Sequence, residues 1–263
     1  RPIIDYASSD GQGHYLRLAA LPAFDQTGFH LVPTDLISGL PELTDGVDSE
    51  PVRLDIRVGD FSSEWLAVPW MPQSVEAPGE WRHDPVTGSV VAVGPDRARA
   101  TRQLRYLVTA RLLQPGQPEI VAAQAGDPQD SGLTLALPDE LDPQVLALAH
   151  QVTAEATTAG ERALALASWL RSEEFTYSTA IVNGSTLETV SDFLLVSRTG
   201  YCEQFAGSLA ILARAVGVPS RVVVGFLPGT ATADGYQVSS KDMHAWTEVF
   251  LDGLGWVALD PTP

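Results

Sequence analysis

Residues 198–219 read RTGYCEQFAGSLAILARAVGVP, and this stretch decides the fold that the sequence predicts. Its apolar run predicts a helix over 202–216, which Gly217 and Pro219 end. Cys202 is the first residue of that helix. Because the first turn of a helix carries unpaired backbone N–H groups and a partial positive charge, this position favours a thiolate and can bind a developing oxyanion.

Cys202 is the single cysteine of the chain, so no intramolecular disulfide can form. A lone cysteine is more often a small buried side chain without chemistry, and that alternative stays open. A structural cysteine would more naturally lie in the middle of a helix on its buried face, so the position favours a nucleophile. Gly200 and Tyr201 are candidates for substrate or oxyanion contact, since a glycine lets the backbone turn tightly and a substrate chain come close.

His244 is the candidate base for the thiol. It opens a predicted strand after a flexible loop at 228–235, and as a base it must lie within about 3 to 4 Å of the sulfur. Asp260, at the end of the next strand, is the candidate acceptor for the second ring nitrogen. The alternatives are a surface or core histidine, and an aspartate that only forms a turn before Pro261. Trp246 would either wall the cleft or belong to the core.

The two strands that carry His244 and Asp260 are joined at 252–255. A simple even loop would pair Leu251 with Trp256 and place the two candidates on opposite faces of the hairpin. Catalysis needs both side chains on one face. The sequence therefore predicts an odd register, made by a three-residue loop or by a bulge at one of the two glycines of this segment.

The whole chain predicts an α+β protein in two parts. Residues 1–125 are β-rich and predict an antiparallel β-sandwich-like domain, residues 126–136 a linker, and residues 137–263 a catalytic domain with the cysteine-bearing helix packed on an antiparallel sheet. Strands of the first part are predicted over 15–20, 52–58, 89–93 and 105–110. The second part predicts further helices over 143–157 (with Asp142 as N-cap), 160–173 and 190–197, and strands over 220–227, 245–251 and 256–260.

Charge and hydropathy exclude several classes of protein. The 263 residues carry a net charge of −17, which repels nucleic acid and anionic lipid surfaces. Their mean hydropathy is +0.04, which suits a soluble body with a core. No run approaches the roughly 18 to 20 apolar residues that a membrane helix needs. No loop has the oxygen-ligand spacing of a calcium site, so we expect neither a metal nor a cofactor.

Four blocks in this order resemble the bacterial transglutaminase-like core, and the resemblance covers residues 137–263. The N-terminal half is more loosely similar to the segment that precedes this core in membrane-anchored bacterial proteins of the TgpA type, through Tyr15–Leu18 and Phe24–Asp25. The four blocks are 198–206, 213–225, 244–249 and 255–263.

The resemblance implies a papain-like fold with Cys202 as nucleophile, His244 as base and Asp260 as the residue that orients the base. In the animal enzymes an upstream aromatic helps to hold the oxyanion, and Tyr177 is the nearest candidate, although a packed aromatic is the simpler interpretation. The resemblance also implies membrane helices on both flanks in the full protein. This soluble portion would then lie on the extracytoplasmic face of the bacterial cell membrane.

The function that follows is thiol-dependent acyl transfer on amide groups through a cysteine thioester. The acyl donor would be a glutamine or similar amide of a protein or peptide, and the acceptor a primary amine or water. One alternative is a cysteine peptidase or amidase that hydrolyses peptide or cell-wall amides with the same triad. Another is a catalytically silent module that binds an envelope partner.

Overall fold

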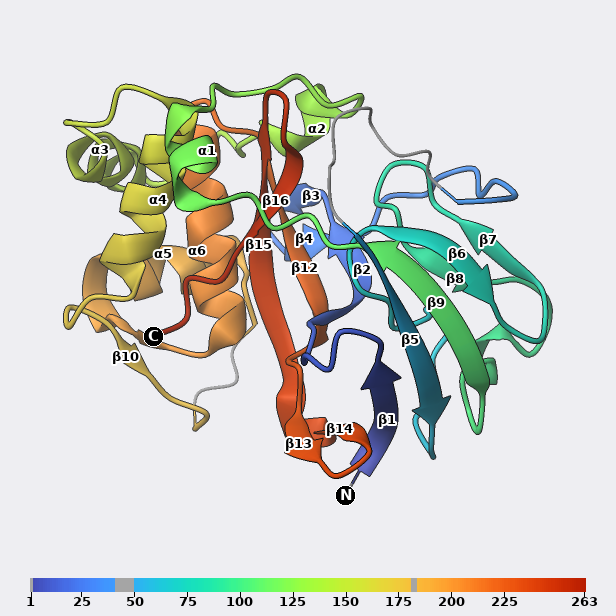
Figure 1. Ribbon diagram of the computed structural model, residues 1–263. Coiled ribbons are helices and arrows are strands. Elements are labelled where there is room, and N and C mark those ends of the chain that lie inside the picture. Colours follow the sequence, from blue (N-terminus) through green and yellow to red (C-terminus); the bar gives the residue numbers. More distant parts are fainter. Residues whose placement is uncertain (1, 41–49, 181–183) are drawn as a thin grey trace. The chain divides into compact units, whose positions relative to one another are not determined.

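The computed structural model describes residues 2–40, 50–180 and 184–263, which form two compact units (Figure 1). Neither unit is one continuous stretch of chain. Unit 1 consists of residues 1–20, 33–113 and 224–244, and unit 2 of residues 21–32, 114–223 and 245–263. The division into domains at 125 and 137 stays a prediction, because compactness alone does not show where an independently folding domain ends.

Unit 1 is built on a six-stranded sheet with the order β13-β14-β1-β5-β9-β6, and every printed pairing in it is antiparallel. Side chains of β5 alternate between the core and the solvent, as a sheet with one buried face requires. The strands are β1 (Pro2–Ser8), β5 (Pro51–Val58), β6 (Pro72–Glu76), β9 (Arg105–Arg111), β13 (Thr230–Thr232) and β14 (Gly235–Ser239).

Shorter elements cover the buried face of this sheet. Leu54, Ile56 and Val108 of the sheet share one apolar cluster with Leu66 and Val90. The short elements of unit 1 are β2 (Leu16–Leu21), β7 (Trp81–His83), β8 (Val90–Ala92) and a 3-10 turn (Arg97–Arg99). The predicted sheet-rich N-terminal part is confirmed.

The flexible loop predicted at 228–235 is wrong, because most of it belongs to the hairpin of β13 and β14. Val238 of this hairpin is fully buried, and the ring of Tyr236 stacks on Tyr6 of β1 at a centroid distance of 5.4 Å. These two apolar contacts pair β14 with the first strand of the chain. Glycine and small polar residues hid the strands from sequence analysis.

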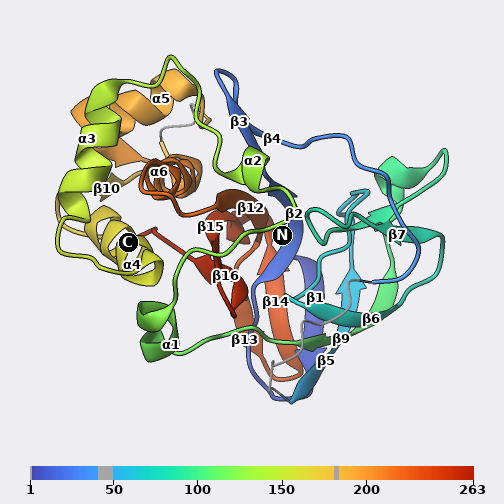
Figure 2. The same ribbon diagram turned by 90° about the horizontal axis from the view of Figure 1, so that it is seen from above.

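Unit 2 contains the helices of the molecule (Figure 1). The predicted N-cap is confirmed, since the Asp142 carboxylate accepts a hydrogen bond from Gln144 N at 2.8 Å. Figure 2 looks along α6, with α3, α4 and α5 beside it. The helices are α1 (Gln117–Ala122), α2 (Ser131–Thr134), α3 (Pro143–Val152), α4 (Ala159–Leu170), α5 (Leu187–Asp192) and α6 (Cys202–Ala215).

Two helical details differ from the prediction. The predicted linker at 126–136 contains α2, and α1 directly precedes it with a backbone N–H of Gly116 held by Glu119 Oε2 at 2.7 Å. The helix predicted over 190–197 begins earlier, because the Thr186 hydroxyl caps it, and continues as a π-helical turn. A cap that lies outside the apolar repeat is what moves the start.

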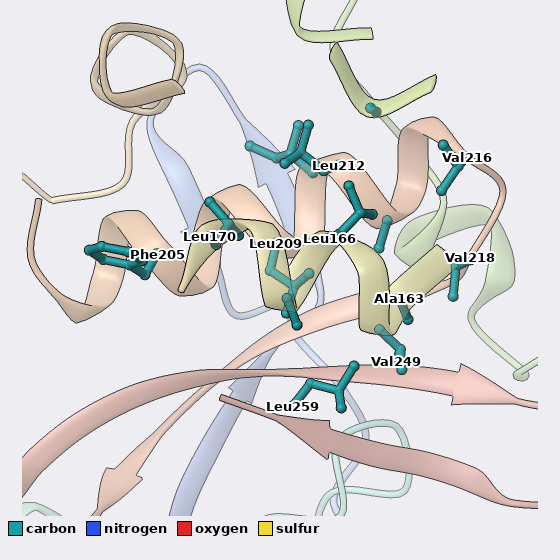
Figure 3. Packing of buried hydrophobic residues seen from close by; sticks show 14 of the residues in the cluster. Ala163, Leu166, Leu170, Phe205, Leu209, Leu212, Val216, Val218, Val249 and Leu259 are labelled. Carbon is teal, nitrogen blue, oxygen red and sulfur yellow. The ribbon is translucent and has the colours of Figure 1, made fainter. Parts of the chain in front are cut away.

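The core of unit 2 lies between helices α4 and α6 and the strands β15 (Met243–Leu251) and β16 (Gly255–Leu259) (Figure 3). Val249 and Leu259 point from the strands toward Leu166 and Leu209 of the helices. β12 (Ser220–Phe226) follows β15 in the sheet order. The predicted α+β core, a cysteine-bearing helix on an antiparallel sheet, is confirmed. Two small sheets complete the unit, β3 (Ala23–Asp25) with β4 (Gly28–His30) and β10 (Thr176–Tyr177) with β11 (Thr199–Gly200).

The odd register predicted for the hairpin of β15 and β16 is also confirmed. Leu251 pairs with Gly255, so three residues form the loop. Gly253 and Gly255 have φ angles of 74° and 71°, a left-handed conformation that glycine adopts without steric cost. In this register the even-numbered residues of the two strands share one face.

Within residues 2–40, 50–180 and 184–263, no helix combines the length and the apolar character that crossing a bilayer requires.

Candidate active site

Cys202 is the first residue of α6, and its side chain is only 2% exposed. The residue before it, Tyr201, has an extended backbone and begins the helix. The amide of Tyr201 donates to Gln204 Oε1 at 2.7 Å, and Gln204 Nε2 in turn donates to the carbonyl of Gly184. The structure therefore confirms the predicted position of the cysteine at a helix N-terminus. The buried side chain of Gln204, which sequence analysis missed, holds the backbone there.

A short parallel pair of strands brings Tyr177 to this helix end. Tyr177 of β10 pairs with Gly200 of β11, two residues before the cysteine. Two backbone hydrogen bonds fix the pair: Thr176 N donates to Arg198 O and Ser178 N donates to Gly200 O, both at 2.8 Å. Sequence separation hides this neighbour, because no local pattern relates residue 177 to residue 200.

The hydroxyl of Tyr177 interacts directly with Cys202. Burial raises the pKa of Tyr177, the negative charges of Cys202 and Asp260 raise it further, and a hydrogen bond from the Cys202 backbone N–H lowers it. A side-chain hydrogen bond with the cysteine adds to the increase. Tyr177 is therefore protonated at neutral pH.

Tyr201 contributes a second hydroxyl. Burial raises the pKa of Tyr201 to about 12, and a side-chain hydrogen bond with Cys202 is the next cause. The rings of Tyr201 and Tyr177 lie 6.0 Å apart between centroids. The cysteine sulfur thus has two protonated phenols as neighbours in unit 2.

Asp260 follows the last residue of β16. Its Oδ1 accepts a hydrogen bond from Thr262 N at 3.0 Å, and its carbonyl oxygen accepts one from Arg171 Nη1 at 2.6 Å. The hydrogen bond from Thr262 N forms a turn before and after Pro261, and such a turn was the alternative role that the sequence predicted for Asp260. The negative charge of the same carboxylate also raises the pKa of Tyr177.

Packing accounts for two other residues that were predicted to lie in the site. Gly200 is buried, and a Cβ there would come within 2.8 Å of the Phe193 ring, so close packing accounts for the glycine. Trp246 is 3% exposed, and this burial fits a core side chain better than the wall of an open cleft.

His244 is the second residue of β15 and is 7% exposed. In the odd register, positions 244 and 260 lie on the same face of the hairpin, as catalysis was predicted to require. The pairing of His244 with Cys202 and with Asp260 stays a prediction.

Comparisons with known proteins give the family of each half. Residues 146–261 match the transglutaminase-like superfamily, and residues 1–117 match the TgpA N-terminal domain. The chain contains a TgpA N-terminal domain over residues 1–117 and a transglutaminase-like core over residues 146–261. Both matches agree with the order of the two parts that the sequence predicts.

Two bacterial proteins are similar to about half of the chain. The chain is 32% identical to the protein-glutamine gamma-glutamyltransferase of Pseudomonas aeruginosa over 147 residues, which is 55% of this chain and 22% of that protein. It is 32% identical to YebA of Bacillus subtilis over 134 residues, 48% of this chain and 18% of YebA. The matched segments therefore cover about a fifth of the length of these relatives.

A solved structure shares the fold of this transglutaminase-like chain. The crystal structure of the periplasmic domain of TgpA from Pseudomonas aeruginosa superposes with a TM-score of 0.75 at 22% identity. The match covers 99% of this chain and 87% of the other. At this identity the likeness establishes the fold.

The site also contains a cluster that sequence analysis did not find. Arg198 forms an ion pair with Glu174 at 3.2 Å, and its guanidinium lies over the rings of Trp169 and Phe175. These residues come from three separate segments, so only the fold could reveal the cluster. Among the described residues, no group of three or more His, Cys, Asp or Glu side chains could hold a metal ion.

Proposed function

We propose that the transglutaminase-like core catalyses thiol-dependent acyl transfer on the side-chain amide of a glutamine in a protein or peptide. Cys202 is the nucleophile, His244 the base and Asp260 the residue that orients the base. The observation that carries this proposal is a buried cysteine that begins a fourteen-residue helix, two residues after Gly200, which pairs with Tyr177.

That arrangement suits a tetrahedral intermediate. The backbone N–H groups at the start of α6 and the Tyr177 hydroxyl are the candidate donors, and protonated donors stabilise the negative oxygen that forms when a thiolate attacks an amide carbonyl. The partial positive charge at the start of α6 acts on the same charge. A buried cysteine with only a packing role needs neither donor.

The reaction proceeds in two balanced steps. The Cys202 sulfur forms a bond to the amide carbon, the carbon–nitrogen bond breaks, and ammonia leaves with a proton from His244, which yields a thioester. A primary amine then attacks the thioester, gives its proton to His244, and releases the thiolate with a new amide bond. Water in place of the amine gives a carboxylic acid instead.

The role of His244 in this scheme rests on the resemblance to the family, and the following part of its strand contacts α6. Three residues later on β15, the Thr247 hydroxyl donates to the carbonyl of Ala206 at 2.8 Å. Ala206 lies in the first turns of α6, so this part of β15 runs alongside the helix end that begins at Cys202.

The names of the relatives support a place outside the cytoplasm. The structural neighbour is described as the periplasmic domain of TgpA, and the glutamyltransferase relative is more than twice as long as this chain. We therefore expect this portion to lie on the extracytoplasmic face of the membrane, anchored by other parts of the full protein. Fusion of a periplasm-dependent reporter to the full-length protein tests this expectation.

The first experiment is alkylation of Cys202 by iodoacetamide between about pH 5 and pH 9, followed by mass spectrometry, in the wild type and in His244→Ala. Rapid alkylation below pH 8 in the wild type, lost in His244→Ala, is the expected result. His150→Ala, on the exposed side of α3, is the matched control and should behave as the wild type. Equal slow alkylation in all three proteins would contradict the enzyme proposal and favour the silent binding module.

A second experiment separates transfer from hydrolysis. A glutamine-containing peptide is incubated with the protein in the presence and absence of methylamine, and the product is identified by mass spectrometry. We expect the methylamide when the amine is present. Glutamic acid under both conditions would instead identify an amidase, and cleavage of the peptide backbone would identify a peptidase.

A further inference from the structure

Arg198 has an unusual backbone for a residue that is not glycine. Its φ angle is 51°, which places it in the left-handed region. It ends the π-helical turn Phe193–Ser197, where its amide donates to Phe193 O at 3.1 Å. A left-handed conformation costs an ordinary residue about 1 kcal/mol or more, so contacts of its side chain and carbonyl must hold Arg198 in place.

The guanidinium of Arg198 is held from three sides. Its centre lies 5.1 Å from the ring centroid of Trp169 and 4.8 Å from that of Phe175, both within the range of cation–π contacts. Nη1 donates to Glu174 Oε2 at 3.2 Å. The other oxygen of Glu174 accepts from Trp169 Nε1 at 3.0 Å, so the carboxylate joins the indole and the guanidinium.

The carbonyl of Arg198 makes a further contact on the same segment. It accepts the hydrogen bond from Thr176 N that begins the pairing of β10 with β11. Arg198 therefore contacts three consecutive residues. Its side chain contacts Glu174 and Phe175, and its backbone carbonyl contacts Thr176. The next residue is Tyr177.

Arg198 is also close to the cysteine along the chain. Only three residues, 199–201, separate it from Cys202. The arginine thus lies between the two segments that bring the Tyr177 hydroxyl to the Cys202 N–H, and it contacts or belongs to both.

We infer that Arg198 is a positioning residue that holds the Tyr177 hydroxyl against Cys202 during acyl transfer. The inference rests on the proposed function, since it assigns Tyr177 as the group through which Arg198 acts. It predicts that Arg198 affects the reaction only while the Tyr177 hydroxyl is present. A general stabilising role predicts instead that the two residues act independently.

The kinetic test is a double-mutant cycle with Arg198→Gln and Tyr177→Phe, using a glutamine peptide and methylamine. We expect Tyr177→Phe to lower kcat about 100-fold, as loss of one oxyanion donor does, and Arg198→Gln about 10-fold with little change in KM. The double variant should equal Tyr177→Phe alone. A further 10-fold loss in the double variant would overturn the inference.

Matched variants guard against an effect of folding. Arg102→Gln removes a surface ion pair of similar length, 3.4 Å to Asp60, in unit 1, and should leave kcat unchanged. Should Arg198→Gln fail to fold, Glu174→Gln removes the charged partner and keeps the shape of the side chain. The double-mutant cycle of Glu174→Gln with Tyr177→Phe then tests the inference. We expect Glu174→Gln to lower kcat less than Arg198→Gln would.

A second measurement does not depend on activity. Carbon-13 labelling of the tyrosines allows the titration of Tyr177 to be followed by NMR, with Tyr177→Phe to assign its signal. Arg198→Gln should lower the pKa of Tyr177 toward the ordinary value of about 10, because the hydroxyl moves away from the negative charges of Cys202 and Asp260 and into solvent. An unchanged titration overturns the inference. A lowered titration in a protein without acyl-transfer activity supports the positioning role and contradicts the proposed function.

Discussion

The two ends of helix α6 are built from different kinds of group. At its N-terminal end Cys202 has Tyr177 and Tyr201 as neighbours, and burial together with the cysteine raises the pKa values of both tyrosines. At its C-terminal end Arg214 is 4% exposed, and its guanidinium donates to backbone carbonyls. The four carbonyls belong to Pro22, Leu133, Ala136 and Ser220, at 2.7 to 3.2 Å.

The residue of α6 that is proposed for catalysis therefore lies at one end of the helix, and the arginine that stabilises the fold lies at the other. Groups that can gain or lose a proton gather at the N-terminal end. Burial lowers the pKa of Arg214 to about 9, which is still well above neutral pH, so the C-terminal end keeps a fixed charge bound to a fixed set of acceptors. The two ends should therefore respond to mutation in opposite ways.

The largest effect is expected at the N-terminal end. Cys202→Ala removes the atom that forms the thioester, so acyl transfer should fall to the background rate. The free energy of unfolding should change by no more than about 1 kcal/mol, since only one sulfur atom is lost. Activity and urea unfolding, measured on the same preparation, check both statements. Retained acyl transfer in this variant would show that the nucleophile lies elsewhere.

The opposite pattern is expected at the C-terminal end. Arg214→Met leaves several buried carbonyls without their donor and should lower the free energy of unfolding by about 3 kcal/mol or more. The activity of the folded fraction, measured well below the midpoint of unfolding, should stay within about twofold of the wild type. Arg102→Met, which breaks an exposed ion pair, is the control and should cost less than about 1 kcal/mol. Equal stability of the two variants would break the comparison.

A smaller effect is expected in the hairpin that carries Asp260. Gly255→Ala places a side chain at a φ of 71°, which should lower the free energy of unfolding by about 1 kcal/mol. An added Cβ would meet no described atom within 4 Å, so the backbone conformation alone is tested. Gly132→Ala in α2 has the same open surroundings without the left-handed backbone, and should be neutral or stabilising.

The smallest effect is a pH dependence at the N-terminal end. The pKa of Tyr201 is raised from about 10 in the unfolded chain to about 12 by burial, so the folded protein keeps this proton longer. Stability is therefore lost as the pH rises from about 10 to about 12. Tyr201→Phe should make this loss shallower, as followed by urea unfolding at several pH values. The same slope in both proteins would contradict the burial of this hydroxyl beside Cys202.

Much of the fold could be predicted, because it depends on local patterns. The apolar run that ends at Gly217 predicted α6, whose last residue in the structure is Ala215. The requirement that positions 244 and 260 share a face predicted the three-residue loop. Both features follow from the periodicity of helix and strand, which one stretch of sequence contains.

The remainder depends on contacts between distant segments. Arg221 and Glu248 form an ion pair at 2.6 Å with both side chains at most 1% exposed, and the arginine lies 3.9 Å from the Trp256 ring centroid. No spacing rule relates the three residues. Tyr177 was proposed only through a resemblance, and its partner Arg198 was not proposed at all, because a two-residue strand pair leaves no periodic trace.

The pairing of β1 with β14 bears on how the molecule is made. Asp5 and Gln237 hydrogen-bond at 2.9 Å across 232 residues of chain, and closing so long a loop costs about 5 kcal/mol of entropy by the logarithmic rule. During synthesis β5 can pair with one edge of β1 early, but the other edge stays open until β14 has been made. An open strand edge recruits other chains, so newly made molecules are most prone to aggregate in that interval. A fragment that ends at residue 125 would remain in that state.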